Sequence, residues 1–335
     1  MIEIRFHNTS TETTSKVTAF VEEWKNDSKS FNTSTSGSTG IPKAIQIRKE
    51  FAENSAKMTH DFLGLKPGSH ALLCLPISSI AGKMMVIRSI VNNYILHVVE
   101  PSSQPLSELD NINFDFAAFV PMQVEQTLKS NPAKFQSVRT VIIGGATINH
   151  NLWDQIASSH KQAFQTFGMT ETISHIAMRK ISSERLPYQI LDGVRIEQSD
   201  ELILDAPMLG VQSLSTNDLI QWIDEKHFEW LGRKDSVINS GGFKIHPERI
   251  EEKLGGLVHQ NYFSIGLKDE KLGERHALAI EGEQEIHKKD LITLLDRKEV
   301  PKELYFFEKF DYTHSNKIDR IKTIARIKDA HKKVL

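Results

Sequence analysis

The sequence predicts an α/β protein, with a large N-terminal α/β domain, an additional small β region and a small α+β C-terminal domain. Between Lys43 and about Gly145, short apolar runs alternate with amphipathic stretches, which is typical of parallel strands linked by helices. After Pro187 the apolar runs are short and alternating, which indicates a small antiparallel sheet or barrel. Beyond residues 232–242, strand and helix patterns are mixed again, and this part forms the predicted C-terminal domain.

A loop of small polar residues precedes the α/β elements. It reads "TSGSTGIPK" over residues 35–43, and a flexible linker is one interpretation of this composition. The following residues favour a binding loop, because 43–51 alternate like a half-buried strand and 51–65 have the apolar period of a helix. Glycine amides, hydroxyls and a lysine held between packed elements can bind phosphate oxygens.

The spacing within this loop differs from that of P-loop nucleoside triphosphatases. Gly37 and Gly40 are three positions apart, and Pro42 separates the second glycine from Lys43. A P-loop has four residues between its glycines and a lysine directly after the second one. Phosphate binding is therefore predicted without the P-loop fold.

The α/β part contains four predicted strands and two predicted helices. The strands are the apolar runs at 70–77, 94–100, 114–120 and 138–145, and the helices are the amphipathic stretches at 81–93 and 121–130. The stretches "VIIGGATI" (141–148) and "FQTFGMTET" (164–172) place glycines where strands end. Ligands of parallel sheets bind at these carboxyl ends, so the sequence predicts a binding site there.

The remaining elements predict the domain boundary. Alternating runs at 191–207 and 218–232 indicate the small antiparallel region, and a helix is expected to begin at Pro247 and Glu248. We place the boundary near Lys234 and Asp235. The predicted domains are therefore residues 1–234 and residues 235–335.

Composition excludes several classes of protein. Of 335 residues, 41 are Lys or Arg and 43 are Asp or Glu, so the net charge is −2 and gives no bias toward nucleic acid. Cys74 is the single cysteine, so an intramolecular disulfide is impossible and a buried strand thiol is expected. No apolar run approaches a membrane span and "MIEIRFHNTS" has no signal-peptide core, which together favour a cytoplasmic protein.

Five stretches together carry a family resemblance. In chain order they are "TSGSTGIPK" (35–43), "TFGMTET" (166–172), "TNDL" (216–219), "GRKDSVINSGGFKIHPERIE" (232–251) and "HSNKIDR" (314–320). The chain resembles the adenylate-forming superfamily of acyl-CoA synthetases, luciferases and peptide-synthetase adenylation domains. Within it, "LPISSIAGKMMVIR" (75–88) and "FGMTETISHIAMR" (167–179) look most like the o-succinylbenzoate-CoA ligases of menaquinone biosynthesis, in a short form.

The resemblance implies an AMP-forming acid-CoA ligase. A carboxylate attacks the α-phosphate of ATP, pyrophosphate leaves, and CoA captures the resulting acyl-adenylate. Because the first step joins two anions, it needs groups that stabilise negative charge at the α-phosphate. The implied substrates are a carboxylic acid, ATP and CoA, and the implied metal is Mg²⁺. The oligomeric state is left open.

The resemblance assigns residues to ATP binding and to adenylation. The catalytic residues are Lys317, Thr170 and Glu171, with Glu171 also the Mg²⁺ ligand. The remaining ATP-binding residues are Thr35, Ser36, Gly37, Ser38, Thr39, Gly40, Lys43, Gly144, Gly145, Ala146, Phe167, Gly168, Asp218 and Arg233. Here Gly144 to Thr147 form an adenine shelf and Asp218 accepts the ribose hydroxyls.

Each of these assignments has a structural alternative. Glu171 could be a solvated surface acid, the glycines at 144 and 145 a turn at a strand end, and Lys317 one surface lysine among many. Asp218 and Arg233 could form a structural ion pair.

The resemblance also implies a hinge, a CoA tunnel and an acid pocket. Asp235 matches the position about which the small domain of the family rotates. Gly241 and Gly242 would then line the pantetheine tunnel, although a glycine pair is also a common tight turn. The residues expected near the acid are Ser78, Ser79, Lys83 and His175, with Arg88 and Arg179 as further partners for a second carboxylate. For each of the four basic residues, the alternative is that it lies nearby without contacting the acid.

One departure from the family concerns the N-terminus. Only 34 residues precede the loop at 35–43, where the family has a much longer segment, so we expect a missing or reduced first subdomain. Two other functions stay open on sequence alone: a ligase or adenylation domain for another acid, and a nucleotide-binding protein without catalysis. The presence of both Lys317 and Glu171 argues against the second.

Overall fold

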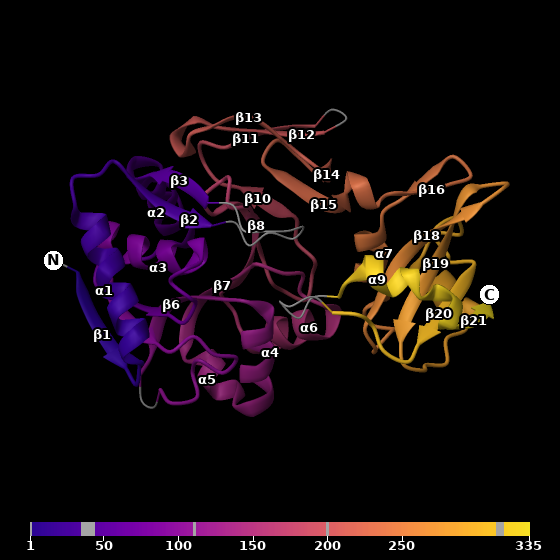
Figure 1. The fold of residues 1–335 in the computed structure, drawn as a ribbon, viewed down its shortest axis with the longest axis horizontal. Helices are drawn as coiled ribbons and strands as arrows, with labels where there is room; N and C mark the ends of the chain where they lie inside the picture. The colour runs from indigo at the N-terminus through magenta and orange to yellow at the C-terminus, as the bar shows by residue number, and fades with distance from the viewer. Residues whose placement is uncertain (1, 35–43, 110–111, 199–200, 313–317) are drawn as a thin grey trace.

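We describe residues 2–34, 44–109, 112–198, 201–312 and 318–335 in a computed structural model (Figure 1). The loop at 35–43 and Lys317 therefore lie outside the described residues. Within the described part, no helix is long and apolar enough to cross a membrane.

A ten-stranded sheet organises the N-terminal region of the described chain. Its strand order is β1-β5-β4-β6-β7-β8-β9-β10-β15-β14. Pairs from β1 to β8 are parallel and pairs from β8 to β14 are antiparallel. The strands span β1 Glu3–His7, β4 His70–Leu73, β5 Ile95–Val99, β6 Phe114–Phe119, β7 Val138–Ile143, β8 Ala163–Gly168, β9 His175–Lys180, β10 Tyr188–Ile190, β14 Asp218–Trp222 and β15 His227–Arg233.

Helices cover both faces of the parallel part. They span α1 Thr11–Lys25, α2 Lys49–Leu63, α3 Ile80–Val91, α4 Pro121–Ser130, α5 Pro132–Gln136 and α6 His150–Ser159. Leu73 packs in the cluster that contains residues of α1, α2 and α3, whereas Leu72 packs with α4, α5 and α6. Successive residues of a strand point to opposite faces, so two separate cores sandwich the sheet.

The antiparallel part differs from the sequence prediction in one respect. A small sheet is present, made of β11 Arg195–Gln198, β12 Leu202–Ala206 and β13 Val211–Thr216. However, β10, β14 and β15 extend the large sheet and do not join the small one. The reason is aromatic packing: the rings of Tyr188 and Phe228 stack with centroids 5.5 Å apart, and Phe167 of β8 packs against both.

A separate sheet forms the core of the C-terminal region. Its order is β17-β16-β19-β20-β21, with β18 paired to β19. The strands span β16 Ile238–Ser240, β17 Phe243–Ile245, β18 Tyr262–Asp269, β19 Gly273–Glu281, β20 Glu303–Phe307 and β21 His331–Val334, and the helices span α7 Pro247–Leu254, α8 Lys288–Leu294 and α9 Arg320–Ala325. A short hairpin of β2 Ser30–Ser34 and β3 Ala44–Arg48 packs with the N-terminal region.

The predicted α/β fold class is confirmed. The large sheet ends at Arg233, a 3-10 turn spans Lys234–Ser236, and the next sheet begins at Ile238. The boundary that we expect near Lys234 and Asp235 falls in this turn, and Figure 1 shows the C-terminal region beside β15 and α6. The proposed rotation about Asp235 stays a prediction.

Candidate active site

The glycines after β7 have a packing role that the structure makes explicit. A Cβ at Gly144 would overlap the hydroxyl of Thr166 on β8, so a glycine lets the two strand ends approach. Gly145 has φ +82°, a conformation that is readily available only to glycine. Gly145 and Ala146 are exposed beyond the carboxyl end of β7, which is where ligands of parallel sheets bind.

Close packing and hydrogen bonds hold the turn between β8 and β9 in place. A Cβ at Gly168 would overlap the carbonyl of Ser174 across the turn. The buried hydroxyl of Thr172 accepts from Met169 N at 3.0 Å and lies 2.7 Å from the Ser174 carbonyl. Ile173 has φ +68°, which is strained for a β-branched residue. This bracing leaves Thr170 half-buried and Glu171 exposed at the sheet edge.

A second group of predicted residues lies on β14 and β15. Asp218 is 9% exposed, pairs with Arg233 in the ladder and accepts a hydrogen bond from Trp230 Nε1 at 2.9 Å. Arg233 is exposed and donates to Asp235 instead, with Nε 3.2 Å from Oδ1. This hydrogen bond raises the pKa of Arg233. Among the described residues, no hydrogen bond or ion pair joins this group to Gly168–Glu171.

The predicted acid-pocket residues have different contacts in the structure, and their role at the acid stays a prediction. Ser79 caps α3, accepting from Gly82 N at 3.1 Å, and Ser78 lines a pocket of about 200 Å³ beside α1. The Lys83 ammonium lies 4.8 Å from the Phe20 ring centroid and donates to the carbonyl of Asn32. Burial there lowers the pKa of Lys83. His175 contacts Thr59 of α2.

His175 belongs to a buried cluster around Arg88 of α3. Arg88 is 2% exposed and donates to Ser174 Oγ at 2.8 Å, to Thr59 Oγ1 at 3.3 Å and to Met85 Sδ at 3.8 Å. His175 Nε2 lies 3.0 Å from the Thr59 hydroxyl, and its Nδ1 lies 3.3 Å from the Ser174 hydroxyl.

The hydrogen bonds of this cluster indicate which ring nitrogen of His175 carries a proton. The Thr59 hydroxyl donates to the Ser55 carbonyl at 3.0 Å, so His175 Nε2 carries the proton that it shares with Thr59, and Nδ1 accepts from Ser174. Burial and the nearby Arg88 hold the pKa of His175 well below its usual value, so the ring is neutral. Burial also lowers the pKa of Arg88 to about 10, which leaves the guanidinium charged at neutral pH.

Arg88 has no acidic partner in the described part of the chain. All three of its hydrogen bonds go to neutral atoms. A buried cation without a carboxylate costs several kcal/mol, so an anionic ligand would stabilise Arg88.

The glycine pair that the resemblance assigns to the CoA tunnel forms a turn. Gly241 and Gly242 join β16 to β17 with φ +58° and +81°, the backbone of a two-residue hairpin turn, so the tunnel role stays a prediction.

No cluster of three metal-ligating side chains occurs among the described residues. A single exposed Glu171 still suits Mg²⁺, which binds one or two carboxylates together with phosphate oxygens.

The fold and these strand-end residues define an adenylate-forming type of α/β enzyme. The family described as AMP-binding enzyme matches residues 4–204, which is more than half of the chain. This chain belongs to the AMP-binding enzyme family, and the predicted superfamily is confirmed.

The curated relatives include 2-succinylbenzoate–CoA ligases. The chain is 27% identical to that of Listeria monocytogenes, over 89% of this chain and 69% of the relative. It is 26% identical to the probable 2-succinylbenzoate–CoA ligase of Mycobacterium tuberculosis, over 87% of this chain and 83% of the relative.

Two solved structures illustrate the similarity in fold. An acyl-CoA synthetase (AMP-forming)/AMP-acid ligase II-like protein from Dyadobacter fermentans is 33% identical, with a TM-score of 0.65 and 96% of each chain covered. O-succinylbenzoate Coenzyme A Synthetase from Bacillus subtilis, in complex with ATP and magnesium ion, is 22% identical, with a TM-score of 0.74, 88% of this chain covered and 69% of that one.

The contact between Thr59 and Arg88 could not be predicted from the sequence. Thr59 was not predicted as a site residue, because its contact with Arg88 joins helices that are 29 positions apart. Arg88 itself carried a usable signal, since it lies inside the apolar run "MMVIRSIV" and a charge within such a run is expected to be buried with a purpose.

Proposed function

We propose that this chain is a 2-succinylbenzoate–CoA ligase. It activates the acid with ATP in the presence of Mg²⁺, releases pyrophosphate and transfers the acyl group to CoA, which is the step of menaquinone biosynthesis that the resemblance implies. The names of the curated relatives support this proposal. Because ATP and CoA are cytoplasmic metabolites, we also propose a cytoplasmic location.

The observation that carries the proposal is the buried Arg88. A substrate with two carboxylates must leave one of them outside the reaction, and this one needs a cation. Arg88 lies beside Ser174 and His175. These two residues come three and four positions after the predicted catalytic residue Glu171. A guanidinium binds a carboxylate with two parallel hydrogen bonds, and the neutral ring of His175 adds no competing charge.

The predicted ATP-binding residues would each contact a different part of ATP or its Mg²⁺. Asp218, with one carboxylate oxygen accepting from Trp230, would accept a ribose hydroxyl with the other. Thr170 would donate to the α-phosphate, and the exposed carboxylate of Glu171 would hold Mg²⁺, which neutralises phosphate charge when bound. The loop at 35–43 and Lys317, outside the described residues, would contact the phosphates and the reacting carboxylate.

The test is an acid screen with two readouts. Pyrophosphate release is measured with ATP, Mg²⁺ and one acid at a time, and any thioester formed with CoA is identified by its mass. We expect turnover with 2-succinylbenzoate and far less with benzoate, a medium-chain fatty acid or either analogue that lacks one of the two carboxylates. Equal turnover of the fatty acid would reject the substrate and keep the ligase.

Arg88→Met tests the residue itself. We expect kcat/KM for 2-succinylbenzoate to fall by about 10²-fold, the scale of losing one partner of a buried charge pair, while activity with the analogue lacking the spare carboxylate changes little. Arg139→Met, at an exposed arginine of β7, is the matched control. An equal loss with both acids would mean that Arg88 has only a structural role.

A further inference from the structure

Helix α7 of the C-terminal region packs against the N-terminal region. A Cβ at Gly255, directly after α7, would overlap the Cβ of His150 at the start of α6. Glu248 of α7 accepts a hydrogen bond from Ser236 at 2.8 Å. The chain passes between the two regions once, through the turn Lys234–Ser236. Among the described residues, this turn and the α7 interface both contribute to their relative orientation.

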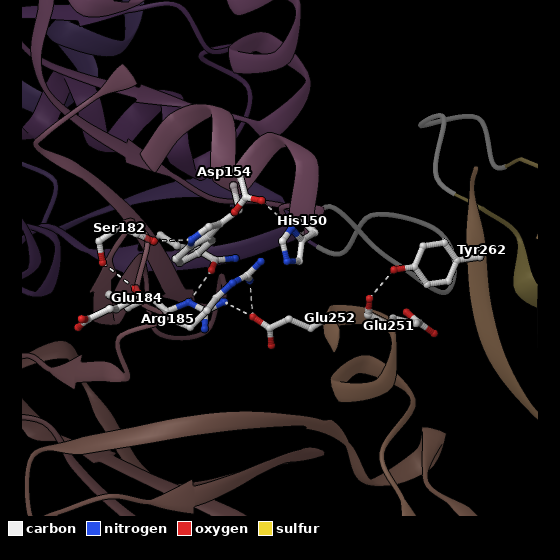
Figure 2. A network of polar contacts seen from close by, with 11 residues as sticks. His150, Asp154, Ser182, Glu184, Arg185, Glu251, Glu252 and Tyr262 are labelled. Carbon is white, nitrogen blue, oxygen red and sulfur yellow. Dashed lines mark hydrogen bonds and ion pairs between the residues drawn. The ribbon is translucent and has the colours of Figure 1, made fainter. Parts of the chain in front are cut away.

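One carboxylate of α7 makes the ion pairs across this interface. Glu252 Oε1 lies 2.5 Å from Arg185 Nη1 and 3.4 Å from Arg179 Nη2, and Figure 2 shows Glu252 extending from α7 toward Arg185. We call these three residues the Glu252 clasp.

The two arginines are held together on the N-terminal side. Their guanidinium carbons lie 4.6 Å and 4.4 Å from the ring centroid of Trp153. Arg179 is anchored further by donating to Gln165 Oε1 at 2.8 Å, and Trp153 by donating to the Ser182 carbonyl at 2.8 Å. Glu252, which comes from the other region, thus places one negative charge against two cations that pack on one tryptophan.

We propose that the Glu252 clasp is a latch that holds the C-terminal region in the orientation seen here. Separation of α7 would leave Arg179 and Arg185, which both pack against Trp153, without their shared anion. Like charges repel, so the clasped orientation is favoured. Glu252 is therefore a positioning residue, and its consequence for catalysis rests on the proposed ligase function, whose two half-reactions use one small domain.

The orientation can be measured without any substrate. Gln136→Cys on α5 and Lys289→Cys on α8 are exposed positions in the two regions, and the native Cys74 is buried, so a dye pair reports the distance between regions by single-molecule fluorescence transfer. We expect one dominant distance in the parent protein. In Glu252→Gln we expect a second population, with the clasped-to-open ratio lowered about tenfold, intermediate between a surface and a buried ion pair.

Glu270→Gln is the matched control, because it removes the same charge from the exposed turn between β18 and β19. It should leave the distance distribution unchanged. An unchanged distribution in Glu252→Gln, with the protein folded by circular dichroism, would overturn the latch. A double-mutant cycle with Arg185→Gln should be non-additive, since both changes break the same contact; additive effects would also overturn it.

A second pair of variants tests the interface without changing charge. Gly255→Ala places a methyl group into His150, whereas at Gly256 the nearest atoms to an added Cβ are at an ordinary 3.8 Å. Gly255→Ala should open the clasp and Gly256→Ala should not. Equal behaviour of the two alanine variants would mean that this interface does not hold the orientation.

The functional consequence is tested separately by single-turnover assays of each half-reaction. Glu252→Gln should change the ratio of the adenylation rate to the thioester-forming rate by about tenfold, in line with the change in orientation. An orientation shift without any ligase activity in the parent protein would reject the proposed function and keep the latch. An orientation shift with an unchanged ratio would reject the positioning role.

Discussion

Single side chains at the candidate site show what burial does to a polar group. Arg88, Thr59 and His175 form one hydrogen-bonded unit in which each hydroxyl and ring nitrogen has one consistent role. The sequence could predict that Arg88 is unusual, because of its apolar neighbours. It could not predict Thr59 as a partner, because that contact needs the packing of α2 on α3. Nor could it predict the strained φ of Ile173, which the surrounding turn imposes.

Thr59→Val tests this unit at the scale of one hydroxyl. Valine preserves the shape but leaves the donors of Arg88 and His175 without their acceptor, which costs about 1–3 kcal/mol. We expect urea denaturation to show this loss in the free energy of unfolding. Thr127→Val is the matched control, because Thr127 is also a buried helical threonine and its hydroxyl donates to its own i−4 carbonyl. An equal loss in both variants would mean that Arg88 and His175 gain nothing from Thr59.

At the scale of elements, three parallel strands share a chain of imidazoles. His97 of β5 lies between His7 of β1 and His70 of β4, with nitrogen separations of 2.8 and 2.9 Å. Each contact holds one proton between its two nitrogens, so a neutral His97 donates to one neighbouring ring and accepts from the other. Burial, followed by the charges of His7, His70 and Arg5, lowers the pKa of His97 to about 4, and Glu3 opposes this effect.

The imidazole chain predicts a pH dependence of stability. Because the pKa of His97 is lower in the folded state than in the unfolded state, the unfolded chain binds more protons between about pH 6.5 and pH 4. Stability should therefore fall as the pH falls through this window, by about 3 kcal/mol from this residue. Urea denaturation across the window should show a shallower slope for His97→Leu. The exposed His259→Gln should keep the parent slope, and a parent slope in His97→Leu would contradict the prediction.

The elements themselves were predictable where local patterns agreed with packing. The helix predicted at 121–130 matches α4, and the strand predicted at 114–120 ends one residue beyond β6. The predicted strand at 70–77 is longer than β4, because after Leu73 the chain turns toward α3, whose cap Ser79 bonds back to Pro76. The sheet membership of β14 and β15 was not predictable, since period-two alternation does not say which sheet a strand joins.

At the scale of the whole molecule, the turn between the two sheets is the predicted hinge. Asp235 is exposed there and pairs with Arg233, the predicted ribose contact. The same residue lies in the single connection between the two regions. Proline at this position would fix φ and remove an N–H. We expect Asp235→Pro to retain adenylate formation and to slow thioester formation by orders of magnitude.

Single-turnover assays of both half-reactions on the folded variant provide the measurement. Asp235→Ala is the control, because it removes the ion pair with Arg233 and leaves the backbone free. If Asp235→Pro formed the CoA thioester at the parent rate, Asp235 would not be the hinge.

The pairing of β1 with β5 has a consequence for the order of folding. Glu3 lies opposite Ile95, so β1 finds its partner only when about ninety more residues have been synthesised. Pairing over such a separation is slow, because a long loop must close before contacts form. Phe20 and Trp24 of α1 pack on Phe31 of the short β2–β3 hairpin, but the large sheet that α1 covers is incomplete until β5 is made. On the ribosome, part of the apolar face of α1 should therefore stay open to chaperones until β5 has emerged.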